Sequence, residues 1–293
     1  MLSRASILSS MNRLSTADRV RVVTALVEGN SLRGTARITG VARMTIEKLL
    51  RDIGDACAEY HNAHVHGLTS KRIQCDEIWS FVGAKQKNAT PEKKAAGWGD
   101  CWTWTAIDAD SKFVVSYAIG PRVPSVARNF IADVAARLTN RVQITTDGLR
   151  VYVDAVERAF GDDVDYAILD KYYGFAVETG ARYSPARFRG AQRAVIHGKP
   201  DPRHISTSYV ERNNLTVRMH NRRFTRLTNA FSKKLEMHTH SIALHFMYYN
   251  FCRIHQTLRV TPAMEAGLSD HAWSLDELVG LLDASINPAT LAG

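Results

Sequence analysis

The sequence lacks the features of a membrane or secreted protein. No apolar run reaches the roughly 18 residues that a membrane-spanning helix needs, and the N-terminus has no long hydrophobic core of the signal-peptide kind. Internal repeats and low-complexity tracts are also absent, which argues against a repeat architecture. Hydrophobic residues make up 45% of the 293 residues, enough for one large domain and a small one. We therefore expect a soluble intracellular protein with no membrane partner.

Cysteine is scarce, and its spacing argues against disulfide and zinc cross-links. The four cysteines never form a CxxC pair, which argues against a disulfide framework and against a cysteine zinc finger. They are Cys57, Cys75, Cys101 and Cys252. We expect free, buried thiols in a reducing compartment.

Positive charge is concentrated in two blocks of the chain. Residues 178–234 hold 13 Lys/Arg against 3 Asp/Glu, and residues 1–53 hold 9 against 4, while the remainder is net acidic. The whole chain has a formal net charge of +9. Two basic blocks on an acidic remainder favour a polyanionic partner over general solubility charge. A solvated basic face without a partner is the alternative.

Residues 14–53 predict three short helices. An apolar helical period ends at Gly29, Ser31 caps a second helix, and Gly40 turns the chain into a third. A longer helix followed by two short ones around a glycine turn is typical of a helix-turn-helix. The third helix would then lie in the DNA major groove, with Ala36 packed against it. Its outward polar side chains are Arg43, Thr45, Glu47 and Lys48. A three-helix bundle with no DNA role is the alternative.

Two groups of histidines could indicate a metal site. The first lies in the polar stretch 52–70, which we interpret as a linker following a helix that ends near Tyr60: His61, His64 and His66. A solvated linker is the preferred interpretation for this group. In a later predicted helix His238 and His245 share one face but His240 does not, and no cysteine or carboxylate partner is evident. We expect packing roles for this second group.

From residue 71 the hydrophobic period changes to that of β-strands. Strands are expected at 72–82, 101–107, 113–119 and 142–146, with a polar loop at 83–96 and a hairpin turn at 108–112. Ser125 would cap a helix between the third and fourth strands, and a helix with Tyr152 on its apolar face would follow the fourth. This order predicts an α/β fold with a mixed sheet flanked by helices.

The C-terminal part is less regular in sequence. Between residues 163 and 205 only a short strand at 166–169 is expected. Helices are expected at 206–225 and 234–254. Residues 274–277 have the form of a capping box that starts a final helix.

Three acidic residues are candidates for a metal site. Asp76 lies inside the first strand and Asp147 follows the fourth, where a carboxylate is costly unless it is paired or bound to a cation. If these strands are neighbours, the two carboxylates can face each other, and Glu211 can approach from a later helix. Three carboxylates suit Mg²⁺, with Mn²⁺ as a substitute, and two such ions support in-line phosphoryl transfer. Because the chain has 29 acidic residues, structural or surface carboxylates are the alternative.

The predicted helix around Glu211 adds a second indication. Glu211, Leu215, Arg218 and Arg222 share one helical face, and Asn214 borders it. This arrangement can hold a metal at one end and a phosphate backbone beyond it. An intrahelical ion pair in an arginine-rich surface helix is the alternative.

The order of these motifs resembles that of insertion-sequence transposases of the IS-one type, within the DDE group. The stretches that carry the resemblance are residues 76–85, 104–108, 146–152 and 205–234, with a tail at Asn250, Arg253, His255, Leu258 and Thr261-Pro262. The resemblance covers roughly residues 71–265 and implies an RNase H-like core. It implies that Asp76, Asp147 and Glu211 form the metal-binding catalytic triad, with Arg218 as the basic residue that follows the glutamate. The family's usual cysteine zinc ribbon has no counterpart here, which leaves the helix-turn-helix for recognition of transposon ends.

The resulting hypothesis is a DNA transposase that cleaves and rejoins DNA at insertion-sequence ends. We expect a helix-turn-helix domain at 1–60, a linker at 61–70, the catalytic domain at 71–265 and a helical tail at 266–293. The expected DNA-binding residues are Arg43, Thr45, Lys48, Asn214, Arg218, Arg222 and Arg223. The expected partners are transposon ends, target DNA and at least one further copy of the chain, in the prokaryotic cytoplasm at the nucleoid. A catalytically silent DNA-binding regulator derived from a transposase, or a nuclease without strand transfer, is the alternative.

Overall fold

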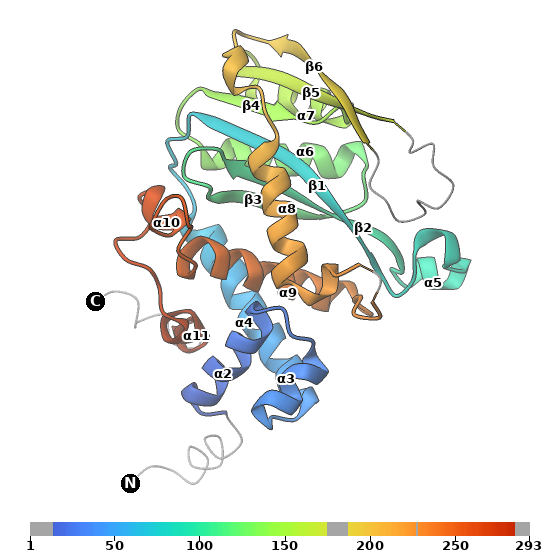
Figure 1. Cartoon of the computed structure of the whole chain (residues 1–293), viewed down its shortest axis with the longest axis vertical. Helices are drawn as coiled ribbons and strands as arrows, with labels where there is room; N and C mark the ends of the chain where they lie inside the picture. The colour runs from blue at the N-terminus through green and yellow to red at the C-terminus, as the bar shows by residue number, and fades with distance from the viewer. Residues whose placement is uncertain (1–13, 175–186, 227, 285–293) are drawn as a thin grey trace.

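The structure is a computed structural model that describes residues 14–174, 187–226 and 228–284. It has a sheet covered by helices at one end and a helical part, built from the first and last described helices, at the other (Figure 1). None of the helices in these ranges combines the length and apolar character that a bilayer crossing requires.

The three helices expected near the N-terminus are present. Their bounds are Thr16–Val27 (α2), Leu32–Thr39 (α3) and Arg43–His64 (α4). The Ser15 and Ser31 side chains cap α2 and α3 by accepting backbone N–H groups at 3.1 and 3.0 Å. Gly40 ends α3 at a φ of 74°, a left-handed conformation that glycine adopts without strain. The turn between α3 and α4 therefore depends on this glycine.

Helix α4 is longer than the sequence predicts. It continues past Tyr60 to His64, so the expected linker begins inside a helix. His61 is buried, and its Nε2 lies 3.1 Å from the carbonyl oxygen of Val115, so the expectation of a solvated histidine is wrong at this position. His61 is polar and on that ground predicts exposure, whereas its contacts with Val115 and Tyr117 of the sheet bury it.

Six strands form one mixed sheet in the order β3-β2-β1-β4-β5-β6. Their bounds are Arg72–Val82 (β1), Gly99–Asp108 (β2), Val114–Gly120 (β3), Val142–Thr146 (β4), Val164–Gly174 (β5) and Arg187–His197 (β6). Strands β1, β4 and β5 run parallel, and the other neighbouring pairs are antiparallel. The α/β class and the mixed sheet expected from the sequence are confirmed.

Strands β1 and β4 are direct neighbours, the condition on which the acidic site depends. Their last paired residues are Cys75 and Thr146. The next residue on each strand is an aspartate, Asp76 on β1 and Asp147 after β4. The register of this parallel pair thus places the two carboxylates side by side where the strands stop pairing.

Helices cover both faces of the sheet (Figure 1). Helices α6 (Pro124–Arg137) and α7 (Val151–Phe160) pack on one face, and α8 (Ser208–His220) and α9 (Leu235–Met247) lie on the other. Val123, not Ser125, is the N-cap of α6, because Pro124 occupies the first helical position, where its missing N–H costs nothing. The expected Ser125 cap is therefore wrong.

Alternation along β1 determines which helices its side chains meet. Ile73 and Cys75 belong to the core formed with α6 and α7, whereas Ile78 packs with Val210 and Val217 of α8. In the first half of β1, even-numbered side chains therefore point toward α8, and odd-numbered ones toward α6 and α7.

Several short elements were not anticipated from the sequence. The polar loop after β1 contains η1 (Gln86–Asn88) and α5 (Pro91–Ala95). Strand β5 extends well beyond the expected 166–169 and pairs with β6, and η2 (Pro202–His204) follows. Helix α9 ends at Met247 and continues as a π-helix (Tyr248–Cys252), followed by α10 (Pro262–Glu265). Helical phase alone cannot separate an α-helix from the π turn that extends it.

Helix α11 (Leu275–Ala284) starts at the expected capping box, which is confirmed. Ser274 Oγ accepts the N–H of Glu277 at 3.2 Å, and the Glu277 carboxylate accepts the N–H of Ser274 at 2.8 Å. The helix packs on α2 and α4. The C-terminal part thus joins the N-terminal helices in one packed unit (Figure 1).

Helices α4 and α9 cross closely at a glycine. A Cβ atom placed on Gly54 would lie 2.4 Å from Cβ of His240, a distance that real side chains do not adopt. His238 is buried between hydroxyl groups, with Nε2 3.1 Å from Ser80 Oγ and Nδ1 2.8 Å from Ser232 Oγ. His240 and His245 are buried as well, but His240 Nδ1 lies 3.3 Å from Asp55 Oδ1, a carboxylate partner that was not expected from the sequence. The close approach of α4 and α9 fixes the N-terminal helices against the sheet-bearing part.

Candidate metal centre and nucleic-acid interface

A cavity of about 600 Å³ opens where β1 and β4 end their shared ladder. Its walls come from β1, the loop after β4, the middle of β5 and the first turns of α8. Asp76, Asp147 and Glu211 all line it. The structure therefore brings the three residues of the predicted triad together from three separate segments of the chain.

Asp76 is held by two donors. Its Oδ1 accepts the backbone N–H of Glu77 at 2.8 Å, and its Oδ2 accepts the side-chain amide of Asn214 at 2.8 Å. Helix α8 is anchored beside it, because Gln74 Oε1 accepts the N–H groups of Tyr209 and Val210 at 2.8 and 3.2 Å. Strand β1 thus positions both the aspartate and the helix that contacts it.

Asp147 is held by the turn that follows β4. Its Oδ1 accepts the N–H of Leu149 at 3.0 Å, and its Oδ2 lies 3.7 Å from Nη2 of Arg122. Gly148 leaves room for a further carboxylate, since a Cβ atom there would lie 3.0 Å from Oδ1 of Asp170. Asp170 lines the same cavity.

Glu77, like Asp170, was not assigned to the site from the sequence. Its side chain is fully buried on the α7 side of the sheet. Arg122 Nε donates to its Oε1 at 2.8 Å, and the Tyr152 hydroxyl donates to its Oε2 at 3.5 Å. Oxygen atoms of Asp76, Glu77 and Asp147 lie within 4.8 Å of one another. An acidic residue directly after Asp76 in an apolar strand was the signal that could have identified it.

Arg122 is the cation that joins this group. It pairs with Glu77 and Asp147, and its guanidinium carbon lies 4.0 Å from the ring centroid of Trp102. The side chain is therefore held between an aromatic face and two carboxylates.

Glu211 differs from the other carboxylates in its contacts. It lies in the first turn of α8 and is not among the three whose oxygens lie within 4.8 Å. Thr207 Oγ1 donates to its Oε1 at 2.6 Å, and the Lys171 ammonium from β5 pairs with the same oxygen. Glu211 therefore faces the cavity and forms an ion pair with a lysine there.

Burial and mutual repulsion make this group of carboxylates electrostatically costly. Burial raises the pKa of Asp76 to about 8, and the charges of Glu77 and Asp147 add to the shift. Burial also raises the pKa of Asp147, against the opposing effect of Arg122. The Glu211 carboxylate raises the pKa of Asp76 and of Asp147, so its charge acts on the same site.

The donor set of this cavity suits a hard divalent cation. Oxygen ligands are available from several carboxylates, and no histidine or cysteine is among the described residues that line the cavity. A bound cation would offset the repulsion that raises the pKa of Asp76. The acidic cluster thus has the oxygen donors of a site for a hard divalent cation.

The expected DNA-binding residues divide between two places. Asn214 and Arg218 line the acidic cavity, and Arg218 Nη1 donates to the carbonyl of Phe224 at 3.4 Å. Arg222 and Arg223 do not line it, since α8 ends at His220 and they lie in η3 (Arg222–Phe224). The expected helical face from Glu211 to Arg222 is therefore wrong at its end. Asn221 causes the break, because its side chain caps η3 by accepting the N–H of Arg223.

Three expected DNA contacts lie at the start of α4. Arg43, Thr45 and Lys48 are exposed. Arg43 Nη1 lies 3.5 Å from Glu47, and Lys48 Nζ lies 2.7 Å from Asp52. Arg43 lines a second cavity together with Arg222 and Arg223, which Thr45 and Lys48 do not line.

Comparison with known proteins identifies a relative. No protein-family model matches the chain. The insertion element iso-IS1n protein InsB of Shigella dysenteriae is 26% identical over 165 residues, a match that covers 56% of this chain and 86% of that protein.

One solved structure gives a weaker match. A piggyBac transposase, in a cryo-EM synaptic complex with hairpin DNA, aligns with 98% of this chain and 77% of its own at 11% identity. The TM-score of 0.38 is too low to show a shared fold. The sequence match to the InsB protein confirms the resemblance expected from the motifs: the chain is similar to an insertion-sequence protein of the IS-one type.

Proposed function

We propose that the chain is a DNA transposase of the DDE type that cleaves insertion-sequence ends and joins them to target DNA. The observation that carries the proposal is the convergence of Asp76, Asp147 and Glu211 on one cavity from β1, the β4 end and α8. The similarity to an insertion-element protein supports it. In this proposal residues 71–265 form an RNase H-like catalytic domain.

Asp76, Asp147 and Glu211 would hold Mg²⁺, for which Mn²⁺ can substitute, with Glu77 close enough to contribute charge. When bound, a pair of such cations activates an attacking oxygen and stabilises the leaving one in phosphoryl transfer. Asp76 and Glu77 are largely buried, and electrostatic stabilisation is stronger where the dielectric is low, which suits this chemistry.

The remaining residues of the cavity position the carboxylates. Asn214 fixes the orientation of Asp76 from α8, and Arg122 holds Asp147 and Glu77 from the other side. Lys171 and Thr207 both contact Oε1 of Glu211, and a cation bound by Glu211 would compete with the lysine ammonium and make it available to a phosphate. Arg218 lies on the same wall and is the second cation available to the DNA backbone there.

The N-terminal helices would form the DNA-end recognition unit. We propose that residues 1–60 form a helix-turn-helix domain, with Thr45 and Lys48 on the exposed face of α4 contacting DNA. Residues 61–70 connect it to the catalytic domain, and residues 266–293 form the tail. Because transposition must bring two DNA ends together, the active form would be at least a dimer. A DNA-acting protein of this kind would work at the nucleoid.

A cleavage assay tests the proposal. Supercoiled DNA that carries the flanking ends of the element is incubated with the chain in Mg²⁺, in Mn²⁺ or in EDTA. Nicking and joining are expected with either metal and not with EDTA. The Glu211→Gln variant is expected to be inactive, whereas Glu157→Gln, which removes an exposed carboxylate of α7, is expected to be fully active. Binding of the ends without cleavage under any metal condition would instead indicate a catalytically silent regulator.

A further inference from the structure

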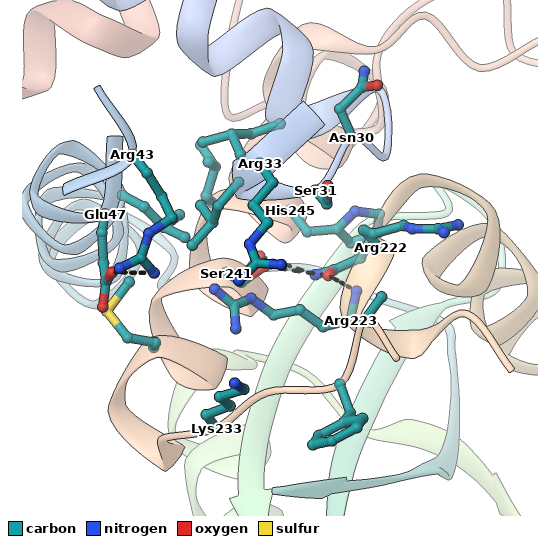
Figure 2. A pocket seen from close by; sticks show the side chains of 18 of the residues that line it. Asn30, Ser31, Arg33, Arg43, Glu47, Arg222, Arg223, Lys233, Ser241 and His245 are labelled. Atoms are coloured by element: carbon teal, nitrogen blue, oxygen red, sulfur yellow. Dashed lines mark hydrogen bonds and ion pairs between the residues drawn. The ribbon is translucent and has the colours of Figure 1, made fainter. Parts of the chain in front are cut away.

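A second, larger cavity lies between the N-terminal helices and the segment after α8. Its volume is about 930 Å³. Residues from the α2–α3 turn and from the start of α4 form one side, and the 220–234 segment and the start of α9 form the other. Figure 2 shows this space from close by. Two segments nearly 200 residues apart in sequence thus enclose one pocket.

Positive charge dominates the lining of this cavity. Six lysine and arginine side chains line it, against one carboxylate, Glu47. The six are Arg33, Arg43, Arg222, Arg223, Lys233 and Lys234. In Figure 2 the side chains of Arg33, Arg43 and Arg223 project from separate elements into the shared space. Like charges brought together in this way repel, unless an anion lies between them.

These cations are almost all without a counter-ion. Among the described residues Arg43 alone of the six has a carboxylate within 4.0 Å, at 3.5 Å from Glu47. Arg223 donates to a neutral group, Ser232 Oγ, at 3.0 Å. Burial lowers the pKa of Arg223 to about 10, with Glu47 opposing the shift. A desolvated guanidinium that lacks an anionic partner is costly in the free protein.

The same cavity contains a buried polar group without a partner. His245 is 4% exposed, and neither of its ring nitrogens forms a hydrogen bond within the described part of the chain. Buried polar atoms are normally satisfied, so two such nitrogens beside six cations are a second sign of a missing ligand. Apolar side chains, including Leu50, Met237 and Leu244, complete the walls. They lower the local dielectric and would strengthen the attraction of an anion.

The walls of the cavity are fixed by close packing. A Cβ atom on Gly29, in the α2–α3 turn, would lie 3.0 Å from the carbonyl oxygen of Met219 at the end of α8. The Tyr248 hydroxyl donates to Glu28 at 3.4 Å nearby. The α2–α3 turn is therefore held directly against the end of α8, so the two walls that carry the cations are fixed relative to each other.

We propose that this cavity binds a phosphate group of the DNA backbone, so that one duplex contacts the α3–α4 helices and the η3 segment at the same time. Arginine forks and lysine ammonium groups are the donors that bind phosphate oxygens. Two segments that are distant in sequence line the cavity. A continuous DNA backbone can contact both of them at once. The inference rests on the proposed DNA-acting function, but it concerns binding only and does not depend on catalysis.

The cavity changes the role expected of Arg43. Thr45 and Lys48 do not line it, whereas Arg43 does. Arg43 is therefore a backbone contact, and base recognition falls to the other exposed residues of α4. Helix α8 links the two sites, since Glu211 lies in its first turn at the acidic cavity and His220 ends it at the basic one. A phosphate held at the basic cavity positions the same DNA relative to the carboxylates.

A salt-dependent binding measurement on the full chain tests this inference. Affinity for a duplex carrying an element end, and for an unrelated duplex, is measured between low and moderate salt. The variants are Arg223→Gln and, in case that change perturbs folding, Arg33→Gln on the opposite wall. Arg158→Gln is the matched control, since Arg158 lies on α7, across the sheet from α8, and Arg128 remains to pair with its partner Asp154.

We expect each cavity variant to weaken binding to both duplexes by about tenfold, because an arginine that binds phosphate reads no base sequence. The slope of log affinity against log salt should fall by roughly 0.9 for each phosphate that the variant no longer neutralises. Unchanged affinity and slope in both variants, with a wild type that binds DNA, would overturn the inference and leave the proposed function standing. A wild type that binds neither duplex would overturn both.

A second readout separates a DNA site from a small-anion site. If the cations repel one another in the free protein, Arg223→Gln should raise the melting temperature in the absence of DNA, while Arg158→Gln should not. DNA should then stabilise the wild type more than the Arg223→Gln variant. Stabilisation by inorganic phosphate with no loss of DNA affinity in the variants would show an ion site without a role in DNA binding and would overturn the proposal.

Discussion

The side-chain amide of Asn214 donates a hydrogen bond to Oδ2 of Asp76 at 2.8 Å, which ties α8 to β1 at the acidic cavity. The other Asp76 oxygen accepts the N–H of Glu77, so both oxygens of this carboxylate are fixed before any cation binds. The same helix carries Glu211 one turn earlier. Asn214 thus orients Asp76 from the helix that also carries Glu211.

Asn214→Ala should impair catalysis without unfolding the chain. The loss of an orienting partner of a metal ligand typically costs ten- to a hundredfold in metal affinity or activity, so we expect cleavage to fall by roughly that factor. Raising the Mg²⁺ concentration should restore part of the rate. Thr216→Ala, an exposed change on the same helix, is the control. Wild-type rates in Asn214→Ala at limiting Mg²⁺ would show that the hydrogen bond has no positioning role.

The raised pKa of Asp76 predicts how stability depends on pH in the absence of metal. The folded chain holds the proton with a pKa of about 8, whereas the ordinary value is 3.8. The folded state therefore binds more protons between about pH 4 and pH 8, and its stability falls as the pH rises through that window.

Asp76→Asn should remove this dependence. We expect the stability advantage of the variant over the wild type to be larger at pH 8 than at pH 5, growing by up to about 1.4 kcal/mol for each pH unit between them. Urea unfolding at the two pH values in EDTA measures the difference. An equal shift at both pH values would mean that the Asp76 carboxylate is not the titrating group. Mg²⁺ should stabilise only the wild type, so that at pH 8 the wild type becomes more stable than the variant.

The ion pair between Arg122 and Glu77 predicts that a second substitution restores the stability lost in a first one. Arg122→Gln leaves the fully buried Glu77 side chain without its cation, which should cost about 1–3 kcal/mol, less than for a fully buried pair because Arg122 is 35% exposed. Glu77→Gln in the same chain should recover most of that loss. Chemical denaturation of the two single variants and the double variant checks it. Additive losses in the double variant would show that the two side chains are not coupled.

The crossing of α4 and α9 predicts a steric effect at Gly54. Gly54→Ala places a Cβ atom 2.4 Å from Cβ of His240 and should destabilise the chain by roughly 1–3 kcal/mol or more. Gly280→Ala is the matched control, because nothing lies within 4 Å of its Cβ position in α11 and alanine favours a helix. Thermal unfolding of both variants compares them. Equal melting temperatures would indicate that the helices do not pack closely in solution.

Much of the sheet could be predicted because alternation and turn residues are local signals. β1 to β4, the hairpin between β2 and β3, and the capping box at Ser274 all follow from short-range patterns. The β5–β6 pair was missed because arginines and polar residues break the apolar alternation in residues 187–197. Backbone pairing with β5 forms this strand without that alternation. Burial of His61 was missed for the same reason, since distant contacts determine it.

The candidate site was predictable in part. Asp76 and Asp147 were indicated as acidic residues inside one apolar strand and directly after another, and the β1–β4 register brings them together. Glu77 and Arg122 were not assigned to the site, because their role depends on tertiary contacts among β1, the loop before α6 and α7. The Lys171–Glu211 pair likewise joins β5 to α8 across sequence positions that no local pattern relates.

The most direct test of the account is the effect of Asp147→Asn on metal-dependent cleavage and joining, measured beside the binding of the same DNA ends. Asparagine keeps the size and hydrogen-bonding shape of the side chain but removes the charge that a cation requires. The account predicts a loss of at least roughly 1,000-fold in Mg²⁺-dependent cleavage and joining, with nearly unchanged DNA binding. Cleavage at the wild-type rate in this variant would contradict the assignment of Asp76, Asp147 and Glu211 as the catalytic triad.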